Sequence, residues 1–258
     1  MTAPVALVTG AARGIGAAAC EALARDGFRV VALDGCVDDA ALEYTLGTEA
    51  QLAEVVESCG ADTEGIVCDV RDGDALASIV ADLNRLDAVV AAAGVVWGGP
   101  PLWETPPAVW DAVFDVNVRG VFHAVRAAMP RLLEHPEPRS GRIVAVASSA
   151  WNRGLLHMGA YAASKHAVVG LVRSLAVDLA DSGITANAVA PGSTETDGLV
   201  ASAAVYGLET PDEFAGHHTI GRLLRPNEVA EGIAWLCSPA ASGVTGSVLA
   251  VDGGMGAV

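Results

Sequence analysis

The amino-acid sequence predicts an α/β protein, with a doubly wound parallel sheet of about seven strands and helices on both faces. Short apolar runs of strand length alternate with longer segments of helical periodicity along the whole chain. Strands separated by helices return in the same direction through right-handed crossovers, which builds a parallel sheet. No linker, repeat or low-complexity tract interrupts the alternation, so we expect residues 1–258 to form one domain.

The expected strands are short, apolar and bounded by polar or turn-forming residues. They span Val5–Thr9, Arg29–Leu33, Gly65–Cys68, Ala88–Ala92, Arg142–Ala147, Thr185–Val189 and Ser247–Val251. The expected helices have apolar residues three and four positions apart. They span Ile15–Asp26, Gly73–Asn84, Pro107–Leu133, Ala160–Ala180 and Asn227–Cys237.

Two segments interrupt this rhythm. Gly35–Glu64 is acidic and long for one crossover, and Ser193–Arg225 is long and weakly periodic. Long irregular segments of compact domains often form lids or binding loops. Because Ser193–Arg225 follows a strand end, where ligands of open α/β sheets bind, we expect it to form the substrate-binding loop region.

Composition excludes several classes of protein. The formal net charge of −16, from 31 acidic and 15 basic residues, argues against nucleic acid or an anionic membrane as partner. The longest apolar run has ten residues and is too short to span a membrane. No export signal is visible, and five scattered cysteines without a C-x-x-C pair favour reduced thiols, so we expect a cytoplasmic protein. Adjacent His217 and His218 do not converge on one ion, so we expect no metal site.

The first strand leads into a glycine-rich turn with Gly10, Gly14 and Gly16, and the turn opens a helix. Glycine lets a phosphate approach the backbone, as in a Rossmann-type dinucleotide-binding domain. Asp34 ends the second strand, where a carboxylate accepts hydrogen bonds from a ribose diol and repels a 2′-phosphate. This favours NAD over NADP, although Arg13 could bind a 2′-phosphate.

Tyr161 and Lys165 are spaced to share one face of a helix. A phenol is a poor base at neutral pH, and a neighbouring ammonium favours its phenolate form. The pair is therefore a candidate acid–base unit, with Tyr161 as the proton acceptor.

With these motifs the whole chain resembles the short-chain dehydrogenases/reductases. The resemblance implies a catalytic set of Asn117, Ser148, Tyr161 and Lys165. It also implies cofactor contacts at Gly10, Arg13, Gly14, Ile15, Gly16, Asp34, Asp69, Val70, Ala93, Gly94, Tyr161, Lys165, Pro191, Gly192, Thr194 and Thr196. The C-terminal Val251-Asp-Gly-Gly254 resembles a segment that lies in the tetramer interface of many members, which implies a homotetramer.

Ser148 and Ser149 compete for one catalytic role. Ser148 lies 13 residues before Tyr161 and seven after Gly141, and both spacings match the family's serine, so we favour Ser148. The chain departs from the family in Ala91-Ala-Ala-Gly94, where N-N-A-G is common. The missing amides usually tie strands together, so we expect a different local hydrogen-bond pattern.

The segment that starts at Asp34-Gly-Cys-Val-Asp-Asp39 resembles the enlarged segment of short-chain dehydrogenases associated with the redox cofactor mycofactocin. That resemblance implies a tightly held NAD that exchanges poorly and is re-oxidised by mycofactocin as an external carrier. Pocket-facing loops are expected to present Trp97, Trp151, Leu155, His157, Met158 and Tyr206.

These features predict an NAD-dependent oxidoreductase that transfers a hydride between NAD and an alcohol or carbonyl substrate. An apolar pocket favours a hydrophobic alcohol. The alternatives are an NADPH-dependent carbonyl reductase, which Asp34 disfavours, and a non-catalytic dinucleotide-binding sensor or scaffold, which would not need Ser148, Tyr161 and Lys165 together.

Overall fold

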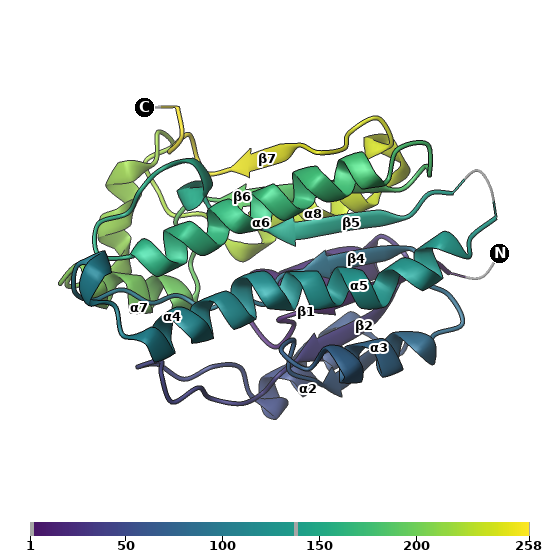
Figure 1. Ribbon diagram of the computed structural model, residues 1–258, viewed down its shortest axis with the longest axis horizontal. Coiled ribbons are helices and arrows are strands. Elements are labelled where there is room, and N and C mark those ends of the chain that lie inside the picture. Colours follow the sequence, from purple (N-terminus) through teal and green to yellow (C-terminus); the bar gives the residue numbers. More distant parts are fainter. Residues whose placement is uncertain (1–2, 137–138, 258) are drawn as a thin grey trace.

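A computed structural model, which describes residues 3–136 and 139–257, confirms the predicted fold class. Seven parallel strands form one sheet in the order β3-β2-β1-β4-β5-β6-β7 (Figure 1). They are β1 (Val5–Thr9), β2 (Arg29–Asp34), β3 (Thr63–Val67), β4 (Ala88–Ala91), β5 (Arg142–Val146), β6 (Thr185–Pro191) and β7 (Val248–Val251).

Helices cover both faces of the sheet. One layer contains α3 (Gly73–Ala81), α4 (Pro107–Phe114), α5 (Gly120–Leu133) and α6 (Gly159–Asp178), seen in front in Figure 1. The other contains α1 (Gly14–Arg25), α2 (Glu49–Cys59) and α8 (Pro226–Cys237). Within β1, Val5 and Leu7 pack in the core on the side of α3, α5 and α6, and Ala6 and Val8 pack in the core on the side of α1 and α8. The strands are apolar throughout because both faces are covered.

Three parts of the secondary structure differ from the sequence prediction. The helix expected over Pro107–Leu133 is divided, because a π-helical turn over Asp115–Arg119 separates α4 from α5. The Gly35–Glu64 segment contains α2, which begins with a capping box between Thr48 and Gln51. The Ser193–Arg225 segment contains α7 (Asp197–Val205), whose small apolar residues face several directions and give no amphipathic stripe.

The strand order positions the site. From β1 the chain builds outward to β2 and β3, then crosses back to place β4 on the other side of β1. Loops that leave neighbouring carboxyl ends therefore diverge between β1 and β4, and ligands of open α/β sheets bind at this point.

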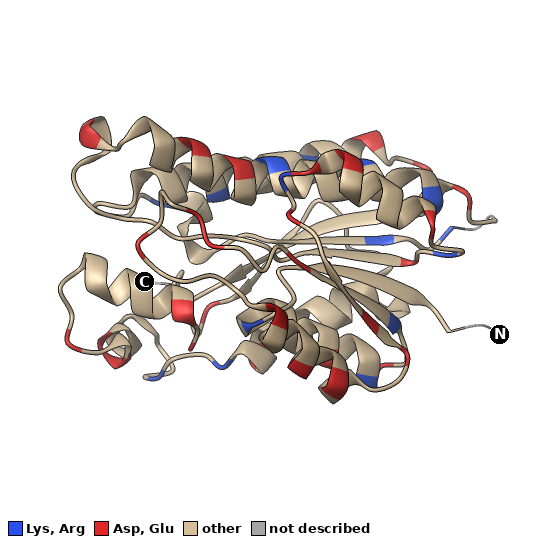
Figure 2. Cartoon of the chain, turned by 90° about the horizontal axis from the view of Figure 1, so that it is seen from below, with Lys and Arg blue, Asp and Glu red and all other residues tan. Residues whose placement is uncertain are grey.

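Charged side chains are spread over the helices and loops of both layers, with acidic ones in the majority (Figure 2). None of the helices in the described part of the chain is both long and apolar enough to cross a membrane.

Candidate active site

A cavity of about 1500 Å³ opens at the carboxyl edge of the sheet. Its walls come from the loops that follow β1, β2, β3, β4, β5 and β6, and from α7. Segments far apart in the sequence, from Gly10 to Met255, therefore line one space.

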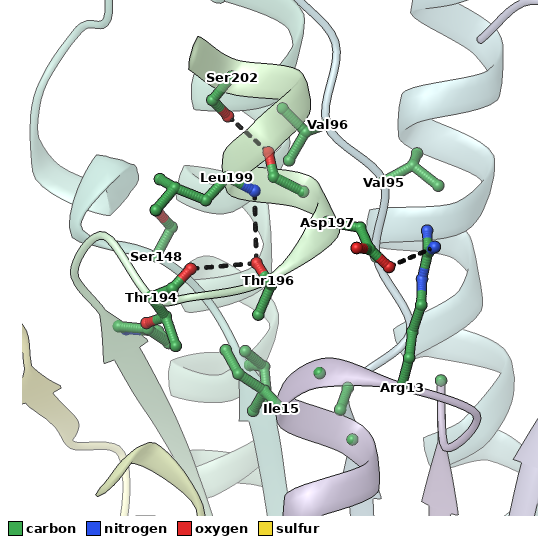
Figure 3. A pocket seen from close by; sticks show the side chains of 18 of the residues that line it. Arg13, Ile15, Val95, Val96, Ser148, Thr194, Thr196, Asp197, Leu199 and Ser202 are labelled. Carbon is green, nitrogen blue, oxygen red and sulfur yellow. Dashed lines mark hydrogen bonds and ion pairs between the residues drawn. The ribbon is translucent and has the colours of Figure 1, made fainter. Parts of the chain in front are cut away.

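The glycine turn after β1 forms the floor of this cavity, with Ile15 pointing into it (Figure 3). Gly10 and Gly14 have φ values of 69° and 59°, which disfavour other residues. A Cβ atom on Gly16 would lie 1.9 Å from the carbonyl oxygen of Gly10, and one on Gly10 would lie 2.6 Å from the backbone of Ala93. The turn therefore exposes its backbone N–H groups without side chains in the way, as a site for the phosphates of a dinucleotide requires.

Asp34 lines the cavity at the end of β2. Its two carboxylate oxygens accept hydrogen bonds from the backbone N–H groups of Ala12 and Cys36, both at 3.0 Å. These bonds hold the carboxylate beside the glycine turn, where it fits a ribose diol.

Asp69 and Val70 line the adjacent wall. Burial favours a higher pKa for Asp69, but hydrogen bonds from Arg71 outweigh it, so the pKa is lowered. Arg71 also pairs with Asp39 at 2.5 Å, which joins this wall to the segment after β2.

Ser148, Tyr161 and Lys165 meet in the cavity. Tyr161 and Lys165 lie one turn apart on α6, and the Lys165 Nζ atom is 5.7 Å from the Tyr161 ring centroid. Burial raises the pKa of Tyr161, whereas a hydrogen bond with Ser148 lowers it. This contact favours Ser148 over Ser149, whose hydroxyl accepts a hydrogen bond from Arg153 instead.

Lys165 is fixed in the cavity wall by a backbone hydrogen bond. Its Nζ atom donates to the backbone carbonyl of Val146 at 2.9 Å. Burial lowers the pKa of Lys165 itself to about 8. Desolvation is therefore the largest influence on the pKa of both side chains.

Asn117 is fully buried in the π-helical turn. Its side chain accepts from Val95 N–H at 2.7 Å and donates to the Val95 carbonyl at 2.9 Å and to Ser164 Oγ at 3.0 Å. Thr9 Oγ1 accepts from Ala93 N–H at 3.2 Å. These bonds secure the loop after β4, where Ala91-Ala-Ala-Gly94 lacks the side-chain amides common in the family.

The loop after β6 forms the opposite wall, with Pro191, Gly192, Thr194 and Thr196 all lining the cavity. Thr194 Oγ1 donates to the carbonyl of Gly192 at 3.0 Å. Thr196 caps α7 by accepting from Leu199 N–H at 3.3 Å (Figure 3). The cap thus fixes the start of α7 to the loop after β6, and both line the cavity together with the glycine turn.

His218 supports this loop from behind, a role that the sequence did not reveal. It is 4% exposed, and its Nε2 atom accepts from Ser193 N–H at 3.0 Å. Its Nδ1 atom lies 2.6 Å from the Arg222 carbonyl, so the two contacts define a neutral ring with the proton on Nδ1. His217, its neighbour, lies against Phe214 and lines the cavity, so the two imidazoles have different surroundings. Among the described residues, no group of three potential metal ligands is present.

Two covers meet above the cofactor half of the cavity. One, the cover segment, is residues 36–47, and the other is α7. Arg13 joins them, because its guanidinium donates to the Thr45 carbonyl at 2.8 Å and to Asp197 at 2.7 Å. Figure 3 shows the bond between Arg13 and Asp197. The Tyr44 hydroxyl accepts from Val96 N–H at 2.9 Å, which ties the cover segment to the loop after β4.

The expected substrate-pocket residues divide into two groups. Leu155, Met158 and Tyr206 line the cavity. Trp97, Trp151 and His157 are not among the residues that line it. Trp97 packs with Leu42 and Val109, and Trp151 packs on the core and stacks under Arg173, because both rings find apolar partners behind the loops. His157 has a φ of 61°, and its Nδ1 atom is buried with no hydrogen-bond partner among the described residues. The sequence missed other lining residues, namely Val96, Leu199, Leu208, Phe214 and Met255.

A family model described as "Enoyl-(Acyl carrier protein) reductase" matches residues 10–256, nearly the whole chain. The chain belongs to the short-chain dehydrogenase/reductase family. A cis-4-hydroxycyclohexanecarboxylate dehydrogenase of Sinomonas cyclohexanicum is 39% identical, and the match covers 98% of this chain and 97% of that protein. An uncharacterised NAD-dependent oxidoreductase of Mycobacterium tuberculosis is 34% identical, over 97% and 94% of the two chains.

Solved structures of other short-chain dehydrogenases share the fold over the same length. A carveol dehydrogenase of Mycobacterium avium in complex with NAD matches with a TM-score of 0.91 and 32% identity, covering 98% of this chain and 97% of that one. The match to this structure extends over nearly the whole of the chain.

The two adjacent histidines provide a matched test of the support behind the β6 loop. His218→Ala should lower the free energy of unfolding by about 2–4 kcal/mol, because it opens a cavity and leaves buried backbone groups unpaired. His217→Ala should change it by less than about 1 kcal/mol, since His217 is exposed. Denaturant unfolding followed by circular dichroism measures both, and equal stabilities would contradict the assigned role of His218.

Proposed function

We propose that this protein is an NAD-dependent dehydrogenase that interconverts an alcohol and its carbonyl compound. The observation that carries the proposal is the meeting of Ser148, Tyr161 and Lys165 in a cavity that also contains the glycine turn and Asp34. One end of this cavity fits a dinucleotide, and the other presents a phenol and a hydroxyl to a reacting oxygen.

The chemistry needs a hydride acceptor and a base. NAD, when bound, supplies the acceptor, and the residues proposed to hold it are those of the glycine turn, Asp34, Asp69-Val70, Ala93-Gly94 and the loop after β6. Tyr161, as the phenolate that the neighbouring Lys165 ammonium favours, accepts the proton of the substrate hydroxyl while the hydride leaves the carbon that bears this hydroxyl. Ser148 hydrogen-bonds the substrate oxygen and orients it towards Tyr161.

Lys165 and Asn117 complete the set. Burial lowers the pKa of Lys165 to about 8, so its ammonium can release a proton near neutral pH and pass on the proton that Tyr161 receives. We propose that Asn117 acts indirectly on this proton transfer, because it holds the backbone of the loop after β4 in place. Its side chain is engaged with Val95 and Ser164, which supports a role in fixing the β4 loop beside the cofactor.

We propose NAD rather than NADP because of the charges at the adenosine end. Asp34 places a carboxylate where a 2′-phosphate would lie. Arg13, the cation that could offset it, already donates to Thr45 and Asp197. An NADPH-dependent carbonyl reductase is therefore the weaker alternative. A non-catalytic dinucleotide-binding sensor is also the weaker alternative, because it would not need the hydrogen bond between Ser148 and Tyr161.

We further propose that the NAD exchanges poorly and that mycofactocin re-oxidises it. Support comes from the ties that fasten the cover segment, namely Tyr44 to Val96, Arg13 to Thr45 and Asp39 to Arg71. These ties reach three other loops of the cavity, so the cover segment must detach from all of them to open the exit. Closing an exit path slows release without changing the chemistry.

The substrate is proposed to be a compact, mostly apolar alcohol. The side chains of Leu155, Met158, Leu199, Tyr206 and Phe214 line that end of the cavity. Two relatives are named for ring alcohols, cis-4-hydroxycyclohexanecarboxylate and carveol, which supports a cyclic secondary alcohol here.

We also propose a homotetramer in the cytoplasm. Large apolar residues that include Trp110, Phe122 and Val177 are exposed on α4, α5 and α6 of the single chain, which supports association. All five cysteines are free, and burial raises the pKa of Cys237 to about 12, which fits a reducing compartment.

Tyr161→Phe should lower kcat/KM for alcohol oxidation by about 100- to 10,000-fold, because the proton acceptor is lost. The binding of NAD and the melting temperature should stay close to wild type, since one hydroxyl is removed. Tyr206→Phe is the control, because among the described residues its hydroxyl donates to the Leu156 carbonyl and its side chain lines the same cavity. Wild-type turnover by Tyr161→Phe would refute the catalytic assignment.

Asp34→Ala should weaken the binding of NAD and reduce its advantage over NADP, by about tenfold or more in the ratio of dissociation constants. Calorimetry on protein stripped of nucleotide measures both constants. Tighter binding of NADP than NAD by the wild-type protein would overturn the proposed cofactor preference.

Purified wild-type protein should retain NAD through dialysis and turn over slowly with free NAD alone, until a dye or quinone-like acceptor is added. Denaturing the dialysed protein and quantifying the released dinucleotide measures retention. Tyr44→Phe and Arg13→Gln should each speed release of bound NAD by about 2- to 10-fold, the effect of a lost hydrogen bond. Empty wild-type protein that runs steadily on free NAD would reject trapping and leave the dehydrogenase proposal intact.

A further inference from the structure

Arg153 lines the cavity and makes only long hydrogen bonds to the described residues. The Lys and Arg side chains that line the cavity are Arg13, Arg71, Arg153 and Lys165. Arg13 pairs with Asp197, Arg71 pairs with Asp39 and Asp69, and Lys165 belongs to the catalytic set. Within the described part of the chain, Arg153 has no carboxylate partner.

The hydrogen bonds of Arg153 leave most of its capacity unused. Nη1 lies 3.4 Å from the Met255 carbonyl and Nη2 lies 3.3 Å from Ser149 Oγ, both longer than usual for a guanidinium. Its Nε atom is buried without a partner among the described residues. A guanidinium has five N–H donors, so this group is short of acceptors.

The location of Arg153 links it to the reacting centre. A single 3-10 turn spans Ser149–Asn152, with Ser148 as its N-cap and Arg153 as its C-cap. Ser148 and Arg153 are therefore fixed to the same short element, and both line the cavity with Leu155 and Met158. An acceptor bound at Arg153 would share the cavity with an alcohol held at Ser148.

We infer that Arg153 binds a carboxylate of the substrate, so that the protein oxidises compact hydroxy acids with an apolar body. A carboxylate matches one guanidinium in charge and in shape, because its two oxygens accept parallel N–H bonds. The Ser149 hydroxyl can add a third bond. A phosphate would carry about two charges against this one cation, in a protein with a net charge of −16. The inference rests on the proposed dehydrogenase function.

A binding experiment tests the inference without turnover. Cyclohexanecarboxylate and cyclohexanecarboxamide have similar shape and differ in charge, and calorimetry on the protein with bound NAD measures both. Wild type should bind the acid about 10- to 100-fold more tightly than the amide, as expected for charge-assisted hydrogen bonds. In Arg153→Gln this preference should disappear, whereas Arg153→Lys should keep part of it.

Arg173→Gln is the matched control, because Arg173 stacks on Trp151 beside the same turn and is not among the residues that line the cavity. It should leave the preference for the acid unchanged. Equal binding of acid and amide by wild type, binding of neither, or a preference that survives in Arg153→Gln would overturn the inference.

Turnover separates this inference from the proposed function. cis-4-Hydroxycyclohexanecarboxylate and its carboxamide are supplied with an artificial electron acceptor. Oxidation of the acid with a kcat/KM about tenfold or more above the amide supports both statements. Oxidation of the amide at an equal or higher rate refutes the carboxylate site and leaves the dehydrogenase. Preferential binding of the acid with no oxidation of either compound counts against the proposed function alone.

Discussion

The close approach of two backbones at the carboxyl edge of the sheet governs the rest of the site. The turn after β1 passes so near the loop after β4 that a Cβ atom on Gly10 would meet the backbone of Ala93 at 2.6 Å. This contact sets the distance between the two halves of the sheet where the strand order reverses. Asp34 is bonded to the turn after β1, and the β6 loop lines the same cavity. The position of this turn therefore affects both the proposed cofactor site and the proposed catalytic groups.

Polar side chains then fix the positions of the loops that surround the cavity. Asn117 fastens the β4 loop from inside the protein, His218 fastens the β6 loop from behind, and Tyr44 and Arg13 fasten the cover segment from above. The first two groups are buried, so the cost of leaving them unpaired keeps the loops in place. The bonds of Arg13 are more exposed and therefore weaker, so we expect the cover segment to be the part of the cavity wall that moves most easily.

The sequence was sufficient for the sheet, for most helices and for the expectation that Ser148, Tyr161 and Lys165 line one cavity, because each of these depends on local periodicity or on a short motif. It was insufficient where partners are distant in the chain. Nothing near Tyr44 indicates that its hydroxyl meets Val96, and nothing near His218 indicates that it supports Ser193. The cap at Thr48 was a readable signal for α2, whereas α7 has no apolar stripe to read. The large side chains of Trp97 and Trp151 were expected in the pocket, and burial against the core drew them away.

The position of Arg13 between the two covers has a thermodynamic consequence. Because one guanidinium bonds both the cover segment and α7, a ligand that holds α7 in place would also help to hold the cover segment in place. Such coupling is reciprocal, so an occupied substrate end would lengthen the residence of the dinucleotide, and a seated dinucleotide would tighten the substrate end. The enzyme would then hold its redox group most firmly while it is at work, and it would be most open to exchange when substrate is scarce.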